Sequence, residues 1–212
     1  MIRLLRSIAY LMDTKESRGT FGEMIVASIF NPRFFGEGEH YVVNDVIFET
    51  PDGATHQIDH IVIYKTGIFC IETKNIEGLI LGHPNVKKWK IYCGKESYEI
   101  FNPILQNKKH VAVLSEFINW KYDIHSIVVF IKGNKPKDCG EEVLNLQELK
   151  DYVKNYSCRE ELGSEDISPA ILVKREMRPV MEIAPLRFIR AISPVIYQPS
   201  RITSAVFSGS SR

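Results

Sequence analysis

The stretch HQIDHIVIYKTGIFCIETK, residues 56–74, decides the fold. It contains two runs rich in β-branched and aromatic residues, 56–64 and 68–74, on either side of a short loop that ends in Gly67. Two such runs around a three-residue loop with a glycine are typical of a β-hairpin. The stretch therefore predicts two adjacent antiparallel strands.

The segments around this hairpin predict a mixed α/β domain. Thr20 and Glu23 have the spacing of a capping box, which predicts a helix over 20–30. Asn102 and Pro103 supply a cap and a first-turn proline for a helix that runs to about residue 120. The remaining elements expected are a strand over 41–49, two or three minor strands within 79–101, a buried strand over 127–131 and a helix over 146–156.

Length and composition indicate one globular domain with extra segments. The chain has 212 residues, of which 44% are hydrophobic and 25% charged. We expect an N-terminal helix over 1–18, a domain over 19–160, and a proline-punctuated linker and tail over 161–212. No apolar run approaches the roughly 18 residues of a membrane-spanning helix. We favour packing of the N-terminal helix on the body, while contact of residues 2–12 with a membrane surface stays open.

Charge and cysteine content exclude several classes of protein. Lysine and arginine total 27 against 26 aspartates and glutamates, a net charge of +1, so the chain is not a histone-like polycation. A local basic groove remains compatible with this balance. The four cysteines form no CxxC pair and no cluster with histidine, so neither a zinc site nor a disulfide framework is indicated. Reduced thiols in a cytoplasmic protein are the simplest interpretation.

Two acids and a lysine gather at one end of the hairpin. Side chains two apart on a strand share a face, so Glu72 and Lys74 point the same way, and the hairpin places Asp59 within reach of Glu72. Carboxylates near a lysine suit a hard cation such as Mg²⁺ and the hydrolysis of a phosphodiester. The structural alternative is an edge-strand ion pair between Glu72 and Lys74, with Asp59 capping a turn.

Several linked motifs resemble one known family. They are GxxGE over 19–23, QIDHIVI over 57–63, GIFCIETKN over 67–75, GLILG over 78–82, Trp89, and NPILQNKKH over 102–110. Together they resemble the nuclease-related domain (NERD) family of the PD-(D/E)XK nuclease superfamily, over about residues 19–131. The resemblance implies a restriction-endonuclease-like αβββαβ core, in which helices flank a central mixed sheet.

The resemblance also implies roles for individual residues. Asp59 and Glu72 become ligands of Mg²⁺ or Mn²⁺, with the backbone carbonyl of Thr73 as a further ligand, and Lys74 becomes the catalytic lysine. Glu23 would be a catalytic acid carried by a helix. As the fourth residue of its capping box, however, Glu23 could instead satisfy a backbone N–H of Thr20.

Other polar residues near the motif divide between site and structure. Gln57 shares the face of Asp59 on the alternating pattern and is expected to bind substrate. Gln106 resembles the helix glutamine that braces the lysine or the substrate, and His110, one turn later, is assigned a structural role. His60 points to the opposite face of the strand, where a buried histidine is commonly a hydrogen-bonded core residue.

The leading hypothesis is a metal-dependent nuclease that hydrolyses DNA phosphodiester bonds, with RNA not excluded. A non-catalytic nucleic-acid-binding or protein-interaction module on the same fold is the alternative, and a homodimer is left open. The lysines that could follow a phosphate backbone are Lys87, Lys88, Lys90, Lys108, Lys109, Lys132, Lys135 and Lys137. Residues 77–101 are the candidate insertion that gives specificity, because a fold by itself does not decide a substrate.

Overall fold

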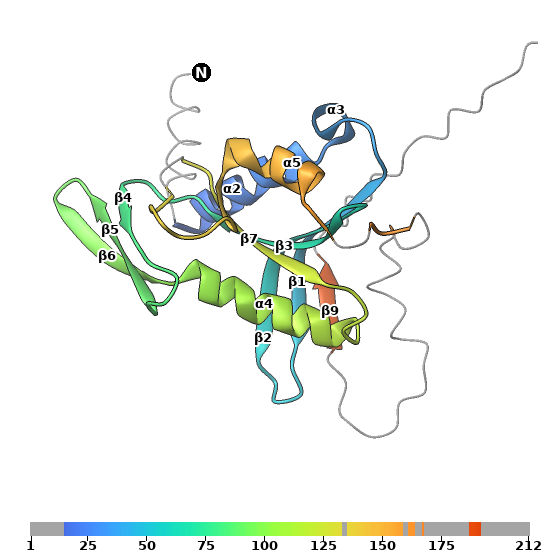
Figure 1. The fold of residues 1–212 in the computed structure, drawn as a ribbon. Helices are drawn as coiled ribbons and strands as arrows, with labels where there is room; N and C mark the ends of the chain where they lie inside the picture. The colour runs from blue at the N-terminus through green and yellow to red at the C-terminus, as the bar shows by residue number, and fades with distance from the viewer. Residues whose placement is uncertain (1–14, 133–134, 159–160, 164–166, 168–186, 192–212) are drawn as a thin grey trace, which may run out of the picture.

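The computed structural model describes residues 15–132, 135–158, 161–163, 167 and 187–191. A large mixed sheet has six strands in the order β8-β7-β3-β2-β1-β9 (Figure 1). Its strands are β1 (His40–Glu49), β2 (Thr55–Tyr64), β3 (Gly67–Lys74), β7 (Ile124–Phe130), β8 (Val143–Asn145) and β9 (Arg187–Ala191). The β2–β3 hairpin is antiparallel, whereas β3–β7 and β7–β8 are parallel. The predicted central mixed sheet is confirmed.

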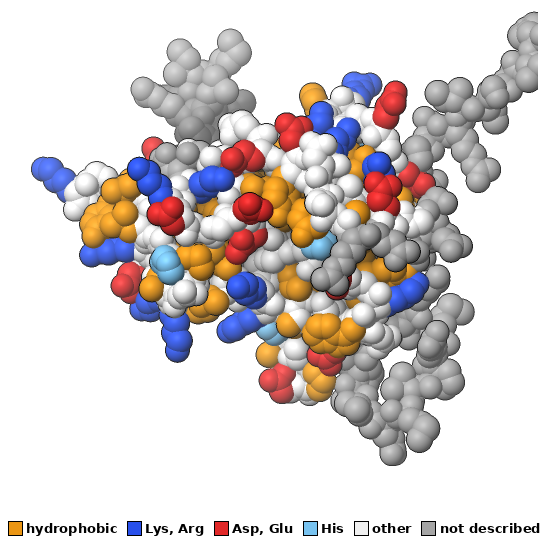
Figure 2. Space-filling view, viewed as in Figure 1, with side chains coloured by type: hydrophobic (Ala, Val, Ile, Leu, Met, Phe, Trp, Pro, Cys, Tyr) orange, Lys and Arg blue, Asp and Glu red, His pale blue; other side chains and the backbone are white. Residues whose placement is uncertain are grey.

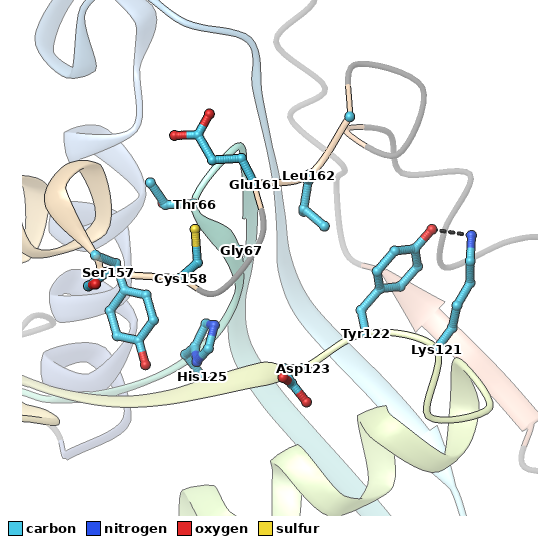
Figure 3. Close-up of a pocket in the computed structure, with 12 residues that line it drawn as sticks. Thr66, Gly67, Lys121, Tyr122, Asp123, His125, Ser157, Cys158, Glu161 and Leu162 are labelled. Carbon is cyan, nitrogen blue, oxygen red and sulfur yellow. Dashed lines mark hydrogen bonds between the residues drawn. The ribbon is translucent and has the colours of Figure 1, made fainter.

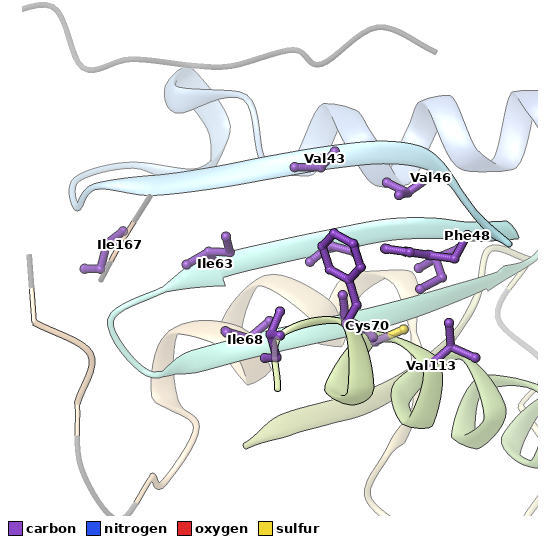
Figure 4. Packing of buried hydrophobic residues seen from close by; sticks show 13 residues of the cluster. Val43, Val46, Phe48, Ile63, Ile68, Cys70, Val113 and Ile167 are labelled. Carbon is purple, nitrogen blue, oxygen red and sulfur yellow. The ribbon is translucent and has the colours of Figure 1, made fainter. Parts of the chain in front are cut away.

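Helices cover both faces of this sheet, as expected. On one face, α4 (Pro103–Phe117) packs Val113, Leu114 and Phe117 onto the aliphatic side chains of β1–β3 (Figure 4). On the other face lie α2 (Lys15–Ile29) and α5 (Leu146–Asn155), which bury Val26 and Leu149 against the sheet. A short helix, α3 (Pro32–Phe35), follows α2. The β3 strand is thus buried between two layers, which explains the apolar run over residues 67–71.

The helix predicted over 20–30 begins earlier than its capping signal indicated. Thr20 and Glu23 both lie inside α2, which already includes Lys15. The capping-box interpretation of Glu23 is therefore wrong, because the N-terminal end of a helix is where such a box acts. Gly22 meets the end of β3 closely: a Cβ there would lie 2.9 Å from Cβ of Asn75.

The predicted minor strands form a separate three-stranded sheet in the order β4-β5-β6. Its strands are β4 (Leu79–Leu81), β5 (Lys88–Cys93) and β6 (Glu96–Phe101). One face of this sheet buries Trp89, whose ring stacks on Phe130 at the end of β7. Trp89 is therefore a core residue of this small sheet.

Asn102 joins the small sheet to α4. Its Oδ1 accepts the N–H of Ile104 at 2.9 Å and so caps the helix, as predicted. Its Nδ2 donates to the carbonyls of His83, Pro84 and Val86 in the loop before β5. One buried side chain thus fixes where α4 starts and how the loop at 83–86 lies against it.

Parts of the predicted terminal segments lie outside the described residues. Of the N-terminal segment, residues 15–18 belong to α2 and the rest is outside the description. Within the segment 161–212, residues 187–191 form β9, which pairs antiparallel with β1. Among the helices described, none is long and apolar enough to cross a membrane.

Candidate functional site

The candidate residues lie where β2 and β3 separate. The pairing of β2 with β3 ends at His60 and Ile71. Beyond that point β3 continues beside β7 as far as Lys74, while β2 continues beside β1 as far as Thr55. Asp59 and Glu72 directly follow the last pair, so both acids stand in the fork between the two strands.

Asp59 is held by the backbone of the neighbouring strand. Its Oδ2 accepts the N–H of Thr73 at 2.7 Å. Burial raises the pKa of Asp59 well above its ordinary value, and the negative charge of Glu72 raises it further, against the opposing effect of the Thr73 N–H. Burial and the neighbouring carboxylate thus both disfavour the charged form of Asp59 in the absence of a cation.

Glu72 and Lys74 form the centre of the site. Glu72 is 2% exposed, and its Oε1 lies 2.5 Å from Nζ of Lys74. Nζ of Lys74 also lies 3.3 Å from Oε1 of Gln106, in the first turns of α4. Burial raises the pKa of Glu72, while the charge of Lys74 and hydrogen bonds from Lys74 and Gln106 lower it. The structure thus brings together three residues singled out from the sequence, with Oε1 of Gln106 accepting a hydrogen bond from the lysine.

The second oxygen of Glu72 faces a histidine. Oε2 of Glu72 lies 3.5 Å from Nδ1 of His110, and neither atom has a hydrogen-bond partner among the described residues. Burial lowers the pKa of His110 to about 4, assisted by the charges of His56 and Lys74. His110 is therefore neutral at neutral pH, and its contact with Glu72 is not an ion pair.

Glu23 approaches the same fork from α2. Burial raises its pKa, followed by the negative charges of Asp45 and Glu72, while Lys74 lowers it. Asp45 is a site neighbour that the sequence reasoning missed. It falls between the β1–β2 pairs Asn44–His60 and Val46–Ile58, with a φ of 52° in the left-handed region. Asp45 therefore lies across from Asp59, and its conformation is one that aspartate tolerates better than most residues.

The side-chain alternation of β2 changes at this irregularity. Ile58 and Ile61 both pack into the cluster under α4, although strict alternation would place them on opposite faces. Gln57 is exposed, and its Nε2 donates to Oδ1 of Asp45 at 2.6 Å. His60 is buried and bonded to Oδ1 of Asn44, and burial lowers its pKa to about 3, in keeping with a core residue.

The donor set of the fork suits a hard cation. Among the described residues, no three acidic, histidine or cysteine side chains already form a cluster that could hold a metal ion. The buried Oε2 of Glu72, however, lacks a hydrogen-bond partner among those residues, and Asp59 is near enough for the charge of Glu72 to raise its pKa. Mg²⁺ and Mn²⁺ bind through one or two carboxylates with carbonyl or water oxygens. Asp59, Glu72 and the carbonyl of Thr73 have the chemistry to hold such an ion.

The structure adds Asn107, a residue that the motif did not single out. Its side chain is fully buried, and its Nδ2 donates to the carbonyls of Cys70 and Ile127 and to Oγ of Ser126. These contacts fasten α4 to β3 and β7 beside Gln106. The sequence signal that could have identified Asn107 was its position next to Gln106 in a helix predicted to pack on the sheet.

Three of the predicted basic residues are engaged in ion pairs with glutamates. Lys88 pairs with Glu99, Lys132 with Glu77 and Lys135 with Glu148. A hollow of about 1010 Å³ lies at the opposite end of β3, lined by Gly67 and His125 among others, and none of the candidate residues lines it (Figure 3).

The sequence comparisons assign this mixed α/β chain to a family. The family model for the nuclease-related domain matches residues 18–131, and the chain belongs to that family. It is 33% identical, over 142 residues, to an uncharacterised protein of Bacillus anthracis. That match covers 66% of this chain and 63% of the relative. No solved structure matches the chain.

Proposed function

We propose that this protein is a metal-dependent nuclease that hydrolyses DNA phosphodiester bonds, RNA being the alternative substrate. The observation that carries the proposal is the fork between β2 and β3, where Asp59, Glu72 and Lys74 converge. A hydrogen-bonded core would bond both oxygens of a buried glutamate, whereas Oε2 of Glu72 has no hydrogen-bond partner among the described residues and only Nδ1 of His110 near it, at 3.5 Å. Apart from the short α3 and the small sheet β4-β5-β6, the elements follow in the order α2-β1-β2-β3-α4-β7, which supports a restriction-endonuclease-like αβββαβ core.

Asp59, Glu72 and the Thr73 carbonyl would hold Mg²⁺ or Mn²⁺. Such an ion, when bound, lowers the pKa of a coordinated water and offsets charge on the phosphate. Lys74 brings an ammonium to the same place, where it orients the attacking water and stabilises the negative charge of the transition state. Gln106 keeps Nζ of Lys74 within 3.3 Å and so fixes its direction. Glu23 supplies a further acid from α2, and Gln57 holds Asp45 at the rim of the fork.

Plasmid cleavage tests the proposal. Supercoiled plasmid and single-stranded DNA are incubated with the protein in Mg²⁺, Mn²⁺ or EDTA, beside Lys74→Ala and Lys65→Ala. Lys65 is exposed at the opposite end of β3 and pairs with Glu161, so it controls for the loss of one positive charge. We expect metal-dependent cleavage that falls about 100-fold or more in Lys74→Ala and is unchanged in Lys65→Ala.

Metal binding is measured separately from activity. Asp59→Asn keeps an acceptor for the Thr73 N–H but loses the negative charge, so calorimetric titration with Mn²⁺ should show clearly weaker binding than the wild type. Equal Mn²⁺ binding by Asp59→Asn would contradict the assigned ligand. Nucleic-acid binding that is indifferent to Asp59→Asn, with no cleavage in any metal, would replace the nuclease by the non-catalytic binding module.

A further inference from the structure

The outer face of the β4-β5-β6 sheet is an exposed surface of apolar side chains and lysines. Residues directly paired across antiparallel strands share a face, and the inner face buries Ile80, Trp89 and Ile91. Facing outward are Leu79, Leu81, Lys88, Lys90, Tyr92, Glu99 and Phe101. We call these residues, with Lys109 of α4, the platform. Figure 2 shows apolar and basic side chains side by side over this end of the molecule, at the left of the view.

Four large apolar side chains of the platform are exposed. Leu79 is 60% exposed, Leu81 53%, Phe101 43% and Tyr92 37%. Exposed apolar side chains that gather on one face indicate a binding surface more strongly than scattered ones do. The two aromatic rings are the part of this surface that can stack on a flat ligand.

Each ring of the platform has a lysine over it. Nζ of Lys90 lies 5.0 Å from the ring centroid of Tyr92, and Nζ of Lys109 lies 5.3 Å from that of Phe101. Lys88 is bonded to Glu99 at 2.9 Å. The cores of protein–protein interfaces are depleted in lysine, whereas surfaces that bind single-stranded nucleic acid combine aromatic rings with positive charge.

We propose that the platform binds a single-stranded stretch of nucleic acid, with bases stacked on Tyr92 and Phe101 and phosphates beside Lys90 and Lys109. A duplex hides the faces of its bases, which leaves exposed rings without a stacking partner. Phe101 pairs with Lys88, four residues from Tyr92 along β5, so the backbone positions of the two aromatic residues are separated by roughly 13 Å along the strand and their rings would take different bases.

The platform is connected to the candidate site. Lys109 lies three residues after Gln106 on α4, so the two are neighbours on the helix surface. Gln106 in turn contacts Lys74. A strand on the platform would therefore lead toward the fork, and in this sense the inference deepens the proposed nuclease by naming its substrate class.

Fluorescence anisotropy tests the platform without cleavage. A labelled oligothymidine of about 20 nucleotides is titrated with the full chain in EDTA. Loss of one stacked base weakens binding roughly five- to 150-fold, so Tyr92→Ala and Phe101→Ala should each do so, while Tyr92→Phe binds like the wild type. Phe34→Ala is the matched control, because Phe34 is a 65% exposed aromatic residue on α3.

Two further measurements address charge and folding. Lys90→Ala should reduce the slope of log K against log salt concentration by about 0.7, the value for one phosphate contact on a single strand. Circular dichroism and thermal melting of every variant should match the wild type, because the substituted side chains are exposed. If an alanine variant of an aromatic residue does not fold, the salt slope of Lys90→Ala decides the question.

Several results would overturn the platform. They are wild-type affinity in both Tyr92→Ala and Phe101→Ala, wild-type affinity in Tyr92→Leu, equally tight binding of duplex, and self-association that Tyr92→Ala abolishes. The outcome is separable from that of the nuclease. Oligothymidine binding that depends on Tyr92, without cleavage of either plasmid or single-stranded DNA in any metal, keeps the platform and rejects the nuclease. Metal-dependent cleavage that needs Lys74, together with oligothymidine binding that does not need Tyr92, keeps the nuclease and rejects the platform.

Discussion

Asn107 fastens α4 to the centre of the sheet, and the effect of removing it can be worked out from its contacts. Its Nδ2 lies 2.8 Å from the carbonyl oxygen of Cys70, 2.9 Å from Oγ of Ser126 and 3.0 Å from the carbonyl oxygen of Ile127. An amide nitrogen has two hydrogens, so three acceptors share about two full hydrogen bonds, each contributing about 1 kcal/mol. The vacated space adds a smaller loss. We expect Asn107→Ala to lower the free energy of unfolding by about 3 kcal/mol.

Urea unfolding followed by circular dichroism measures this change. Lys108→Ala, at the exposed next residue, is the matched control and should stay within about 0.5 kcal/mol of the wild type. Asn107→Leu separates hydrogen bonding from volume, because leucine fills the space but donates nothing. The reasoning is refuted if Asn107→Ala loses less than about 1 kcal/mol, or if Asn107→Leu restores the stability of the wild type.

At three other positions the structure predicts the direction in which a substitution changes the stability of the protein. Asn102→Asp keeps the cap acceptor but loses the donors to the loop at 83–86, so urea unfolding should show a loss of about 1–3 kcal/mol. Gly82→Ala would place a Cβ 2.3 Å from Cδ2 of Trp89, and calorimetry should show a destabilisation of about 1–3 kcal/mol. Gly19→Ala is the control and should not be destabilised, because its Cβ would meet only Oε1 of Glu23, at an ordinary contact distance of 4.0 Å. Burial lowers the pKa of His125 in the folded protein. The contribution of His125 to the free energy of unfolding is therefore fully present above the ordinary pKa of about 6.5 and is lost as the pH drops below it. His125→Gln should remove that part of the pH dependence in unfolding measured from pH 8 to pH 5.

Local signals in the sequence predicted much of the fold. The hairpin followed from two β-branched runs around a glycine loop, and the start of α4 followed from Asn102 and Pro103. These signals succeed because the interactions behind them, alternation along a strand and capping of a helix, involve residues close together in the chain. The capping box at Thr20 failed for the same reason: its spacing carries no information about the residues before it, which continue the helix.

The shape of the candidate site could be predicted only in part. Glu72, Lys74 and Gln106 were expected together, but the fork depends on where β2 stops pairing with β3, which alternation alone does not reveal. Asp45 was missed because its place near Glu23 depends on the left-handed backbone conformation that Asp45 itself adopts in the middle of β1. The same irregularity shifts the alternation of β2, so Gln57 bonds to Asp45.

The start of α4 links the two proposals physically. Asn102 fixes that start. One turn later Gln106 accepts a hydrogen bond from Lys74, and Lys109 lies over the ring of Phe101 in the platform. A small rotation of α4 would therefore move the lysine brace and one edge of the platform together. Because Asn102 also holds the loop before β5, the same side chain sets the small sheet against the helix. The hydrogen bonds of Asn102, a buried residue that would contact neither substrate nor metal, thus help to set the position of the proposed substrate surface relative to the proposed catalytic lysine.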